Sequence, residues 1–331
     1  MSWQHALATE ASGVLELVNA GAHLLFRLGL ARIERADVPV ISVGNIACGG
    51  TGKTPLVAAL ARELQRLGHR PAILTRGYHR QRQEPLLVTE NPTVSWQEAG
   101  DEPALLARAL PSVPLVVDAD RVRGAATAVR ETAATHLILD DGFQHWRLHR
   151  DADIVVVDAS DPLAHRSPRR ERPATLARAT GVVINRVSDR SEAAAVMAWL
   201  GPWAPEAVMI ATKVVPCAVH RGAERLPVEI LKGQKVVVLA GLGNPETFID
   251  TVGDLGAVVV DLQLHPDHHR YRRSELVAAV EAGRQDGAVV VTTGKDIVKV
   301  PTDLAGELLW IEVELVPVFG TFSELLRPAL G

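Results

Sequence analysis

The sequence predicts an α/β protein with a doubly wound, mainly parallel sheet and a second, smaller α/β domain. Short β-branched runs alternate with helical stretches along most of the 331 residues. Such alternation favours a parallel sheet covered by helices on both faces. A glycine-rich turn, GNIACGGTGKTP, lies between the first of these runs and the following helix. The chain is also long enough for two domains.

Composition narrows the possible classes of protein. Apolar residues make up 47% and charged residues 22%, which excludes global disorder. A net charge of -4 gives no support to nucleic acid as the main partner. The two cysteines, Cys48 and Cys217, are too few for a disulfide framework. We find no signal-peptide pattern and no apolar run of the roughly 18 to 20 residues that span a bilayer, so we expect a cytoplasmic-side protein.

Residues 1–36 form the first segment, and residues 11–33 have a helical pattern. The polar residues of this helix fall three or four apart on one narrow stripe: Glu16, Asn19, His23 and Arg27. The rest of its surface is apolar. Such a helix suits a membrane interface, and it equally suits packing on the protein's own core. The pattern alone leaves both interpretations open.

Residues 37–210 are predicted to form a nucleotide-binding domain of the P-loop NTPase type. In GGTGKT, glycines let backbone N–H groups approach phosphates, and the helix N-terminus adds partial positive charge. Lys53 then reaches the β- and γ-phosphates of ATP, and the Thr54 hydroxyl holds Mg²⁺. The loop is a variant, because Ala47 stands where the strict pattern has its first glycine. The residues expected to bind the nucleotide are Ala47, Cys48, Gly49, Gly50, Thr51, Gly52, Lys53 and Thr54.

Alternating elements fill the rest of the chain. In the first domain we predict helices at 55–68, 102–110, 121–132 and 191–200, and strands at 71–74, 113–117, 136–139, 154–157, 182–184 and 208–210. Residues 211–232 are predicted to be a β-hairpin linker with strands 212–220 and 225–230. Residues 233–331 form the smaller domain, with strands 235–239, 257–262, 288–292 and 308–313 and helices 245–255 and 274–282.

Two adjacent carboxylates follow a predicted buried strand. Asp140 comes at the carboxyl end of that strand, where open α/β sheets bind ligands, and Asp141 follows it directly. An acidic residue at this position is placed to hold Mg²⁺ beside the phosphates. Two like charges so close require a cation or hydrogen-bond donors nearby.

Other candidates carry weaker signals. Asp101 begins a predicted helix, where capping alone would explain a carboxylate. His265, His268 and His269 follow a strand of the second domain and suit either acid-base chemistry or metal binding, of which we favour the first. Arg76 and Tyr78 end a strand of the first domain and are placed to contact phosphate or a sugar.

The match to a guanine-binding motif is also weak. The run from Asn185 to Asp189 is similar to N-K-x-D, but its aspartate is one position late. Guanine specificity is therefore unsupported.

Taken together, these stretches resemble the tetraacyldisaccharide 4'-kinases of lipid A biosynthesis. The matching pieces occur in family order from Val43 to Lys299: VGNIACGGTGKTP, TRGYHR, GDEP, DDGFQH, DADIVVVDA, AGLGNPETF, HPDHHRY and TGKDIVK. DDGFQH with a downstream DHH-x-Y is a specific combination, whereas GGTGKT alone is not.

The resemblance implies transfer of the γ-phosphate of ATP, with Mg²⁺, to the 4'-hydroxyl of an acylated glucosamine disaccharide 1-phosphate. It implies a peripheral protein on the cytoplasmic face of the inner membrane, contacting its anionic surface through a membrane-associated N-terminal helix. It also implies two α/β/α domains joined by a β-hairpin. We expect no nucleic acid and no obligate protein partner.

The resemblance also assigns site residues. In the family, the residues matching Asp101 and His268 form a catalytic dyad, and those matching Asp140 and Asp141 are important for activity. Glu171 matches a glutamate near the metal. We therefore expect a catalytic set of Asp101, His268, Asp141 and Lys53; metal ligands Thr54, Asp140 and Glu171; and substrate contacts Asn45, Arg76, Tyr78, Gln144 and His145.

A mechanism follows from these assignments. Asp101 orients His268, which takes the proton of the attacking sugar hydroxyl. Because the two residues belong to different domains, the pair forms only when the domains close, and closure gates catalysis.

Three positions depart from the family pattern. Residues 161–173 are shorter and more basic than the usual segment, Gly294 replaces the glutamate of T-E-K-D, and Ala47 stands where the family often has threonine. Alternative functions are a P-loop switch or partition ATPase acting on a protein partner, a metal-dependent hydrolase built on the histidine cluster, and a non-catalytic nucleotide-binding module. The switch ATPases have a lysine before the paired glycines, where this chain has Cys48, and the hydrolase leaves Lys53 unexplained.

Overall fold

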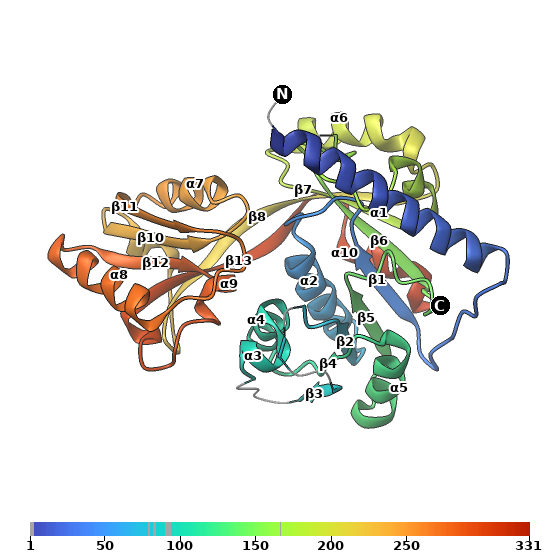
Figure 1. Ribbon diagram of the computed structural model, residues 1–331, viewed down its shortest axis with the longest axis horizontal. Helices are drawn as coiled ribbons and strands as arrows, with labels where there is room; N and C mark the ends of the chain where they lie inside the picture. The colour runs from blue at the N-terminus through green and yellow to red at the C-terminus, as the bar shows by residue number, and fades with distance from the viewer. Residues whose placement is uncertain (1–2, 79, 82–83, 90–93, 166) are drawn as a thin grey trace.

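A computed structural model describes residues 3–78, 80–81, 84–89, 94–165 and 167–331, without the side chains of residues 3–12 and 14. His79 of the TRGYHR motif and Arg166 of the basic segment lie outside the described residues. Two lobes are joined by two long strands (Figure 1). We call α1 to α6, β1 to β7 and α10 the N-terminal lobe, and α7 to α9 with β10 to β12 the C-terminal lobe.

One sheet of 13 strands runs through the described residues in the order β11-β10-β12-β13-β8-β7-β6-β1-β5-β2-β4-β3, with β9 paired to β8. Its strands are β1 Val40–Gly44, β2 Pro71–Thr75, β3 Leu86–Val88, β4 Leu115–Val117, β5 His136–Asp140, β6 Ala152–Asp158, β7 Gly181–Asn185, β8 Val208–Arg221, β9 Glu224–Leu226, β10 Lys235–Gly241, β11 Val258–His265, β12 Val289–Thr293 and β13 Leu308–Phe319. Only β3–β4, β8–β9 and β8–β13 are antiparallel among these pairs. The predicted mainly parallel α/β sheet is confirmed.

Helices cover both faces of the sheet in each lobe. They are α1 Trp3–Arg27, α2 Lys53–Arg66, α3 Trp96–Ala99, α4 Asp101–Ala109, α5 Arg121–Thr132, α6 Arg190–Leu200, α7 Glu246–Asp254, α8 Arg273–Gln285, α9 Gly294–Ile297 and α10 Phe322–Leu330. In the N-terminal lobe, α2, α4 and α10 contribute to the core on one face, and α5 and α6 to the cores on the other. In the C-terminal lobe, α8 and α9 pack on one face and α7 on the opposite face.

Local sequence explains where several helices begin. The Asp120 carboxylate accepts hydrogen bonds from the first backbone N–H groups of α5, and Asp189 does the same for α6. Thr321 and Glu324 form a capping box at the start of α10. The capping role of Asp189 explains why its spacing from Asn185 does not match a base-reading motif.

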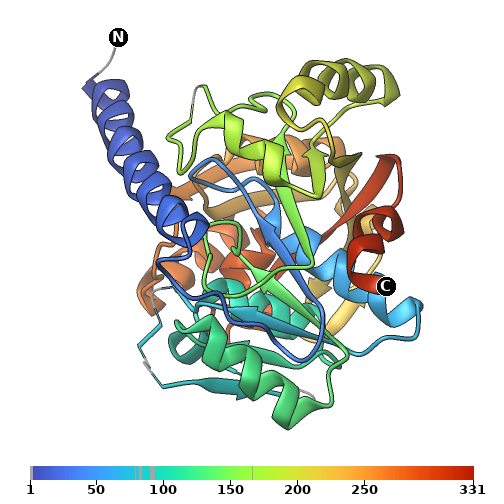
Figure 2. The same cartoon turned by 90° about the vertical axis from the view of Figure 1, so that its right-hand side faces the viewer.

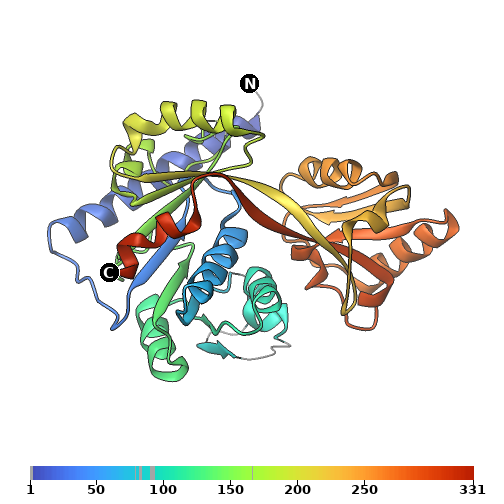
Figure 3. The ribbon, with the colours of Figure 1, turned by 180° about the vertical axis from the view of Figure 1, so that it is seen from behind.

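The linker differs from the predicted hairpin. The expected second strand at 225–230 is reduced to β9, which pairs with only the end of β8. Instead β13, which runs to Phe319 and not only to residue 313, pairs antiparallel with β8 from Leu309–Arg221 to Phe319–Ala211. The two strands lie side by side between the lobes (Figure 3). The local turn at Gly222 thus joins β8 to a short partner, β9, whereas the longer pairing of β8 with β13 is non-local.

Helix α1 lies on the outside of the N-terminal lobe (Figure 2). It docks through its polar stripe, because the Glu16 carboxylate pairs with Arg169 at 2.8 Å and Asn19 Nδ2 donates to the Arg170 carbonyl at 2.8 Å. The His23 ring stacks on Trp146 with centroids 4.3 Å apart. Its apolar residues point outward, with Leu17 71% and Val18 63% exposed. No helix among the described residues is long and apolar enough to cross a bilayer.

Candidate active site

The phosphate loop connects β1 to α2 and depends on two glycines with positive φ. Gly49 has a φ of 112° and Gly52, at the N-cap of α2, a φ of 93°. A Cβ at position 52 would lie 2.1 Å from Nδ2 of Asn185. Only glycine fits both the backbone conformation and the space at this position. The loop therefore delivers Lys53 and Thr54 at the start of α2, as the sequence predicts.

Side chains below the loop hold its backbone. Asn185 is fully buried, and its Nδ2 donates to the Thr51 carbonyl at 3.0 Å. The Oδ1 of Asn185 accepts from Thr212 at 3.1 Å, and Arg186 donates to the Gly50 carbonyl at 3.0 Å. Asn45 Nδ2 donates to the Thr51 hydroxyl at 3.1 Å. Thus Asn45, expected to contact the substrate, lies buried under the loop.

Asp140 ends β5, adjacent to β1, with Val43 as its register partner. The Thr75 hydroxyl donates to its Oδ2 at 3.1 Å, while its buried Oδ1 has no hydrogen-bond partner among the described residues. Burial, followed by repulsion from Glu102 and Asp141, raises the pKa of Asp140 to about 7, against the attraction of Lys53. An unpartnered, buried carboxylate oxygen beside the phosphate loop has the chemistry that Mg²⁺ requires.

Asp141 is held by two cations. Arg170 contacts its two oxygens at 2.9 and 2.7 Å, and Lys53 Nζ lies 3.5 Å from Oδ1. Burial opposes ionisation, but Lys53 and Arg170 outweigh it and keep the pKa of Asp141 below its ordinary value. The carboxylate thereby connects the start of α2 to the segment around Arg170.

The basic segment also contacts the phosphate loop through its backbone. Ala47 and Arg169 form an antiparallel bridge, Cys48 N donates to the Pro168 carbonyl at 2.7 Å, and Arg170 N donates to the Ile46 carbonyl at 2.7 Å. This strand-like contact explains how a segment that is shorter and more basic than the family pattern is still fixed beside the loop.

Glu171, the third expected metal ligand, contacts protein donors through both carboxylate oxygens. Arg178 Nη2 donates to its two oxygens at 2.8 and 3.0 Å, and Gln144 Nε2 donates to Oε1 at 2.8 Å. Gln144 also donates to the Asn45 carbonyl at 3.0 Å. Both carboxylate oxygens of Glu171 are therefore occupied by protein donors, and Gln144 joins them to the floor of the phosphate loop.

Asp101 and His268 come together from the two lobes. Nδ1 of His268 lies 2.8 Å from Oδ2 of Asp101, while Oδ1 accepts from the Glu102 backbone N–H at 3.0 Å. The N-cap of α4 is Gly100, and Asp101 is the first residue of the helix, where its Oδ1 satisfies one first-turn N–H. A role at the helix end therefore accounts for Oδ1, but not for Oδ2, which faces His268. His268 itself has a φ of 61°, a conformation uncommon outside glycine.

Charged groups surround the other side of the imidazole. Lys295 Nζ lies 3.3 Å from Nε2 of His268 and 2.8 Å from Oδ1 of Asp267. Burial raises the pKa of Asp267, but Lys295 outweighs this effect and keeps it below its ordinary value. Gly294, where the family has glutamate, packs against α4, since a Cβ there would lie 3.2 Å from Leu105 Cδ1.

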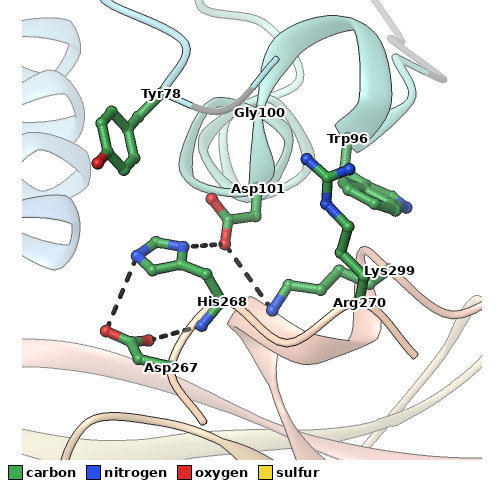
Figure 4. Close-up of a pocket in the computed structure, with 8 residues that line it drawn as sticks. All are labelled: Tyr78, Trp96, Gly100, Asp101, Asp267, His268, Arg270 and Lys299. Atoms are coloured by element: carbon green, nitrogen blue, oxygen red, sulfur yellow. Dashed lines mark hydrogen bonds and ion pairs between the residues drawn. The ribbon is translucent and has the colours of Figure 1, made fainter. Parts of the chain in front are cut away.

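A pocket of about 300 Å³ opens at the pair (Figure 4). Its lining residues are Tyr78, Trp96, Gly100, Asp101, Asp267, His268, Arg270 and Lys299. Tyr78 is 60% exposed, and its ring lies 6.2 Å from that of His268. Both lobes therefore contribute walls to one pocket.

The remaining predicted residues lie outside this pocket. Arg76 is exposed at the end of β2. Burial, together with Arg121 and Arg150, lowers the pKa of His145 to about 4, so the ring is neutral at pH 7. The other members of the histidine cluster do not form a metal centre: His269 pairs with Glu275 at 3.2 Å and stacks on His265 at 4.3 Å. Among the side chains that are described, no group of three or more His, Cys, Asp or Glu is arranged to hold a metal ion.

Sequence reasoning did not single out several residues of this site: Asn185 as a support of the loop, Arg170, Arg178, Lys295 and Lys299. A signal for the lysines existed in the TGKDIVK motif, which contains both Lys295 and Lys299, but these residues meet His268 and Asp101 only in space. Arg170 lay in a segment noted only for its basic character.

Comparison with known proteins gives consistent results. The family model described as tetraacyldisaccharide-1-P 4'-kinase matches residues 4–330. A tetraacyldisaccharide 4'-kinase of Anaeromyxobacter sp. (strain Fw109-5) is 41% identical, covering 97% of this chain and 90% of the relative. One of Syntrophus aciditrophicus (strain SB) is 39% identical, covering 82% and 77%. A crystal structure of LpxK from Aquifex aeolicus in complex with ATP superposes with a TM-score of 0.76 at 29% identity, covering 98% of this chain and 99% of that one.

Proposed function

Because the chain belongs to the tetraacyldisaccharide-1-P 4'-kinase family, we propose that the Asp101–His268 pair removes the acceptor proton in the family's reaction. That reaction transfers the γ-phosphate of ATP to the 4'-hydroxyl of a tetraacyldisaccharide 1-phosphate lipid, giving the 1,4'-bisphosphate. A switch or partition ATPase is not favoured, since the family match extends over both lobes.

The nucleotide is held by the N-terminal lobe. The backbone N–H groups from Gly49 to Lys53 surround the phosphates, and the Lys53 ammonium group neutralises charge on them. Asp141 lies 3.5 Å from Lys53 Nζ and is itself held by Arg170. Protein partners hold these groups in place, so little reorganisation is needed in the transition state.

Mg²⁺ fits the residues at the end of β5. The unpartnered Oδ1 of Asp140 and the hydroxyl of Thr54 would hold the ion, which supplies charge neutralisation at the β- and γ-phosphates. We place Glu171 outside the direct ligands, because Arg178 and Gln144 already occupy its oxygens. Its role is to hold Gln144 and Arg178 against the floor of the loop.

His268 acts as the base through Nε2. The carboxylate Oδ2 of Asp101 accepts a hydrogen bond from Nδ1 of His268, so Nδ1 carries the proton of the neutral ring and Nε2 carries the lone pair. As the 4'-oxygen bonds to the γ-phosphorus, the bond from that phosphorus to the β,γ-bridging oxygen breaks and the hydroxyl proton moves to Nε2. ADP leaves with the bridging oxygen. Such base catalysis contributes roughly 10²- to 10⁴-fold.

Tyr78 is the predicted substrate residue best placed to contact the sugar, since it lines the pocket beside His268. We assign Arg76 and His145 to more distant parts of the acceptor. Asn45 and Gln144 act indirectly, by supporting the phosphate loop.

The single observation that carries this proposal is the 2.8 Å contact between Asp101 and His268 across the two lobes. The test is transfer of label from γ-labelled ATP to a disaccharide lipid monophosphate. We expect Asp101→Ala and His268→Ala to lose transfer while binding ATP normally. Near-normal transfer by either variant would contradict the assignment.

We further propose that α1 anchors the protein at the cytoplasmic face of the inner membrane. The helix uses its polar residues to dock on the lobe and leaves leucines facing outward, including Leu24 and Leu25 at 54% and 50% exposure. This orientation favours the membrane interface over packing on the core, and the acceptor is itself a lipid.

Vesicles of anionic lipid test this part of the proposal. Leu24→Asn with Leu25→Asn should weaken vesicle binding at least about tenfold, because each buried leucine contributes roughly 1.5–3 kcal/mol. The thermal midpoint should not change, since both side chains are exposed. Leu262→Asn with Leu264→Asn, two exposed leucines of β11, is the matched control. Equal loss in both variants would contradict an anchor specific to α1.

A further inference from the structure

A buried lysine of the C-terminal lobe has no part in the mechanism so far. Lys299 is 5% exposed and lies just beyond α9, in the TGKDIVK motif. Its Nζ donates to Asp296 Oδ1 at 3.2 Å and lies 3.8 Å from Oδ2 of Asp101. Figure 4 shows Lys299 reaching Asp101 on the side opposite to Asp267.

The position of Lys299 is set by Asp296, which is fully buried. Oδ2 of Asp296 accepts from the Gly241 backbone N–H at 3.0 Å and from the Thr293 hydroxyl at 2.8 Å. These donors lie at the ends of β10 and β12, so the carboxylate is fixed to the sheet. Its other oxygen then directs the lysine ammonium group toward the other lobe.

Asp101 Oδ2 thus faces two groups of the C-terminal lobe, His268 Nδ1 and Lys299 Nζ. We propose that Lys299 is a positioning residue for the kinase reaction, which attracts the Asp101 carboxylate as the lobes meet and holds it oriented toward His268. The inference rests on the role proposed above for the Asp101–His268 pair. Lys295 does not duplicate this role, because it contacts Asp267 and the opposite nitrogen of His268.

A purely structural role for Lys299 gives a different expectation. If the ammonium group only neutralised buried Asp296, its removal would lower the stability of the protein without ATP, and it would do so whatever residue stood at position 101. If it acts through Asp101, its removal matters for phosphoryl transfer only while Asp101 is present.

The experiment measures kcat, KM for the lipid and the ATP dissociation constant for Lys299→Met, alone and with Asp101→Ala. Because small misplacements of a catalytic group cost about 10²-fold, we expect kcat to fall about 10²-fold with ATP binding unchanged. With Asp101→Ala present, Lys299→Met should lower kcat less than about twofold further. Lys299→Arg should restore a large part of kcat, and Lys235→Met, at an exposed lysine of the same lobe, is the control.

A second variant tests the inference if Lys299→Met does not fold. Asp296→Asn with Lys299→Met removes both buried charges and should show the same loss of kcat. Unchanged kcat in a folded Lys299 variant, or losses that multiply with that of Asp101→Ala, would overturn the inference and leave the dyad intact. Full activity of Asp101→Ala alone would overturn the dyad and this inference together.

Discussion

The phosphate loop and the Asp101–His268 pair are built in opposite ways. The loop is held inside one lobe by buried partners, among them Asn185 at the end of β7 and Asn45 directly after β1. The pair is a single side-chain contact between α4 of one lobe and the segment after β11 of the other. ATP binding is therefore a property of one lobe, whereas proton removal depends on how the lobes meet.

This difference has a functional consequence. If the loop binds nucleotide whether or not the acceptor is present, hydrolysis must be limited elsewhere. We propose that a base assembled from both lobes provides that limit, because its two residues belong to different lobes, which are joined by β8 and β13. Variants in the two regions should separate binding from chemistry.

The largest effect is expected from His268→Ala. Loss of the base should lower kcat by about 10²- to 10⁴-fold, because the proton then has no positioned acceptor. The ATP dissociation constant should not change, since His268 lies in the lobe without the phosphate loop. His269→Ala is a matched control, as this neighbour pairs with Glu275 within its own lobe. Comparable losses of kcat in both variants would contradict a specific role for His268.

Gly52→Ala, in contrast, should weaken ATP binding. A side chain at a φ of 93°, in conflict with Asn185, costs about 1–3 kcal/mol, so ATP affinity should fall roughly tenfold to a hundredfold. Isothermal titration with ATP measures this change. Gly201→Ala, at a position with open space and negative φ, is the control. Unchanged ATP affinity in Gly52→Ala would show that the loop does not need this backbone conformation.

A smaller effect is expected from Asn185→Ala. The substitution leaves the Thr51 carbonyl and the Thr212 hydroxyl without their buried partner, at a cost of about 1–3 kcal/mol in stability. ATP affinity should fall less than in Gly52→Ala, because the glycine conformation remains possible. Denaturant unfolding and ATP titration check both parts. A loss of kcat at saturating ATP larger than the loss of affinity would mean that the loop and the base are not separate.

The effect expected to be smallest at pH 7 is that of His145, because it develops only as the pH falls. Its pKa is about 4 in the folded protein and near 6.5 in the unfolded chain, so the unfolded chain binds more protons between these values. Folding stability should therefore fall as pH drops from about 6.5 through 4, by up to roughly 3 kcal/mol. His145→Asn should reduce this dependence in denaturant unfolding at several pH values. The control is His165→Asn, since His165 is exposed. If wild type and His145→Asn showed the same dependence of stability on pH, the claim that His145 is buried and neutral would be contradicted.

Much of the nucleotide lobe could be predicted because its signals are local. The β-branched run of β1, the glycines of the loop and the start of α2 follow one another in sequence, and Asp140 ends a strand that is buried throughout and has three apolar residues at its centre. The short elements β3, α3, α9 and α10 were not predicted. Strand β3 and helices α3 and α9 have too few residues to show a hydrophobic period. Helix α10 is as long as the predicted helices α4 and α7 and was missed.

Contacts between distant segments could not be predicted from residues alone. The pairing of β8 with β13 joins strands about a hundred positions apart. Beyond Ile311, strand β13 contains Glu312, Glu314 and Pro317, and glutamate and proline are uncommon in strands, so the sequence did not indicate that the strand continues. The Asp101–His268 pair was expected only from the resemblance to a family, since capping was a sufficient local explanation for Asp101. Nothing in the sequence around Glu171 indicated that Arg178 would form an ion pair with its carboxylate.

The most direct test of the central claim is a double-mutant cycle of kcat for Asp101→Ala and His268→Ala, with ATP affinity measured in each variant. If one unit spanning two lobes removes the proton, the double variant should be no slower than His268→Ala alone, and all variants should bind ATP like the wild type. If the two losses multiply, or if either variant loses ATP binding, the residues act independently and the account is contradicted.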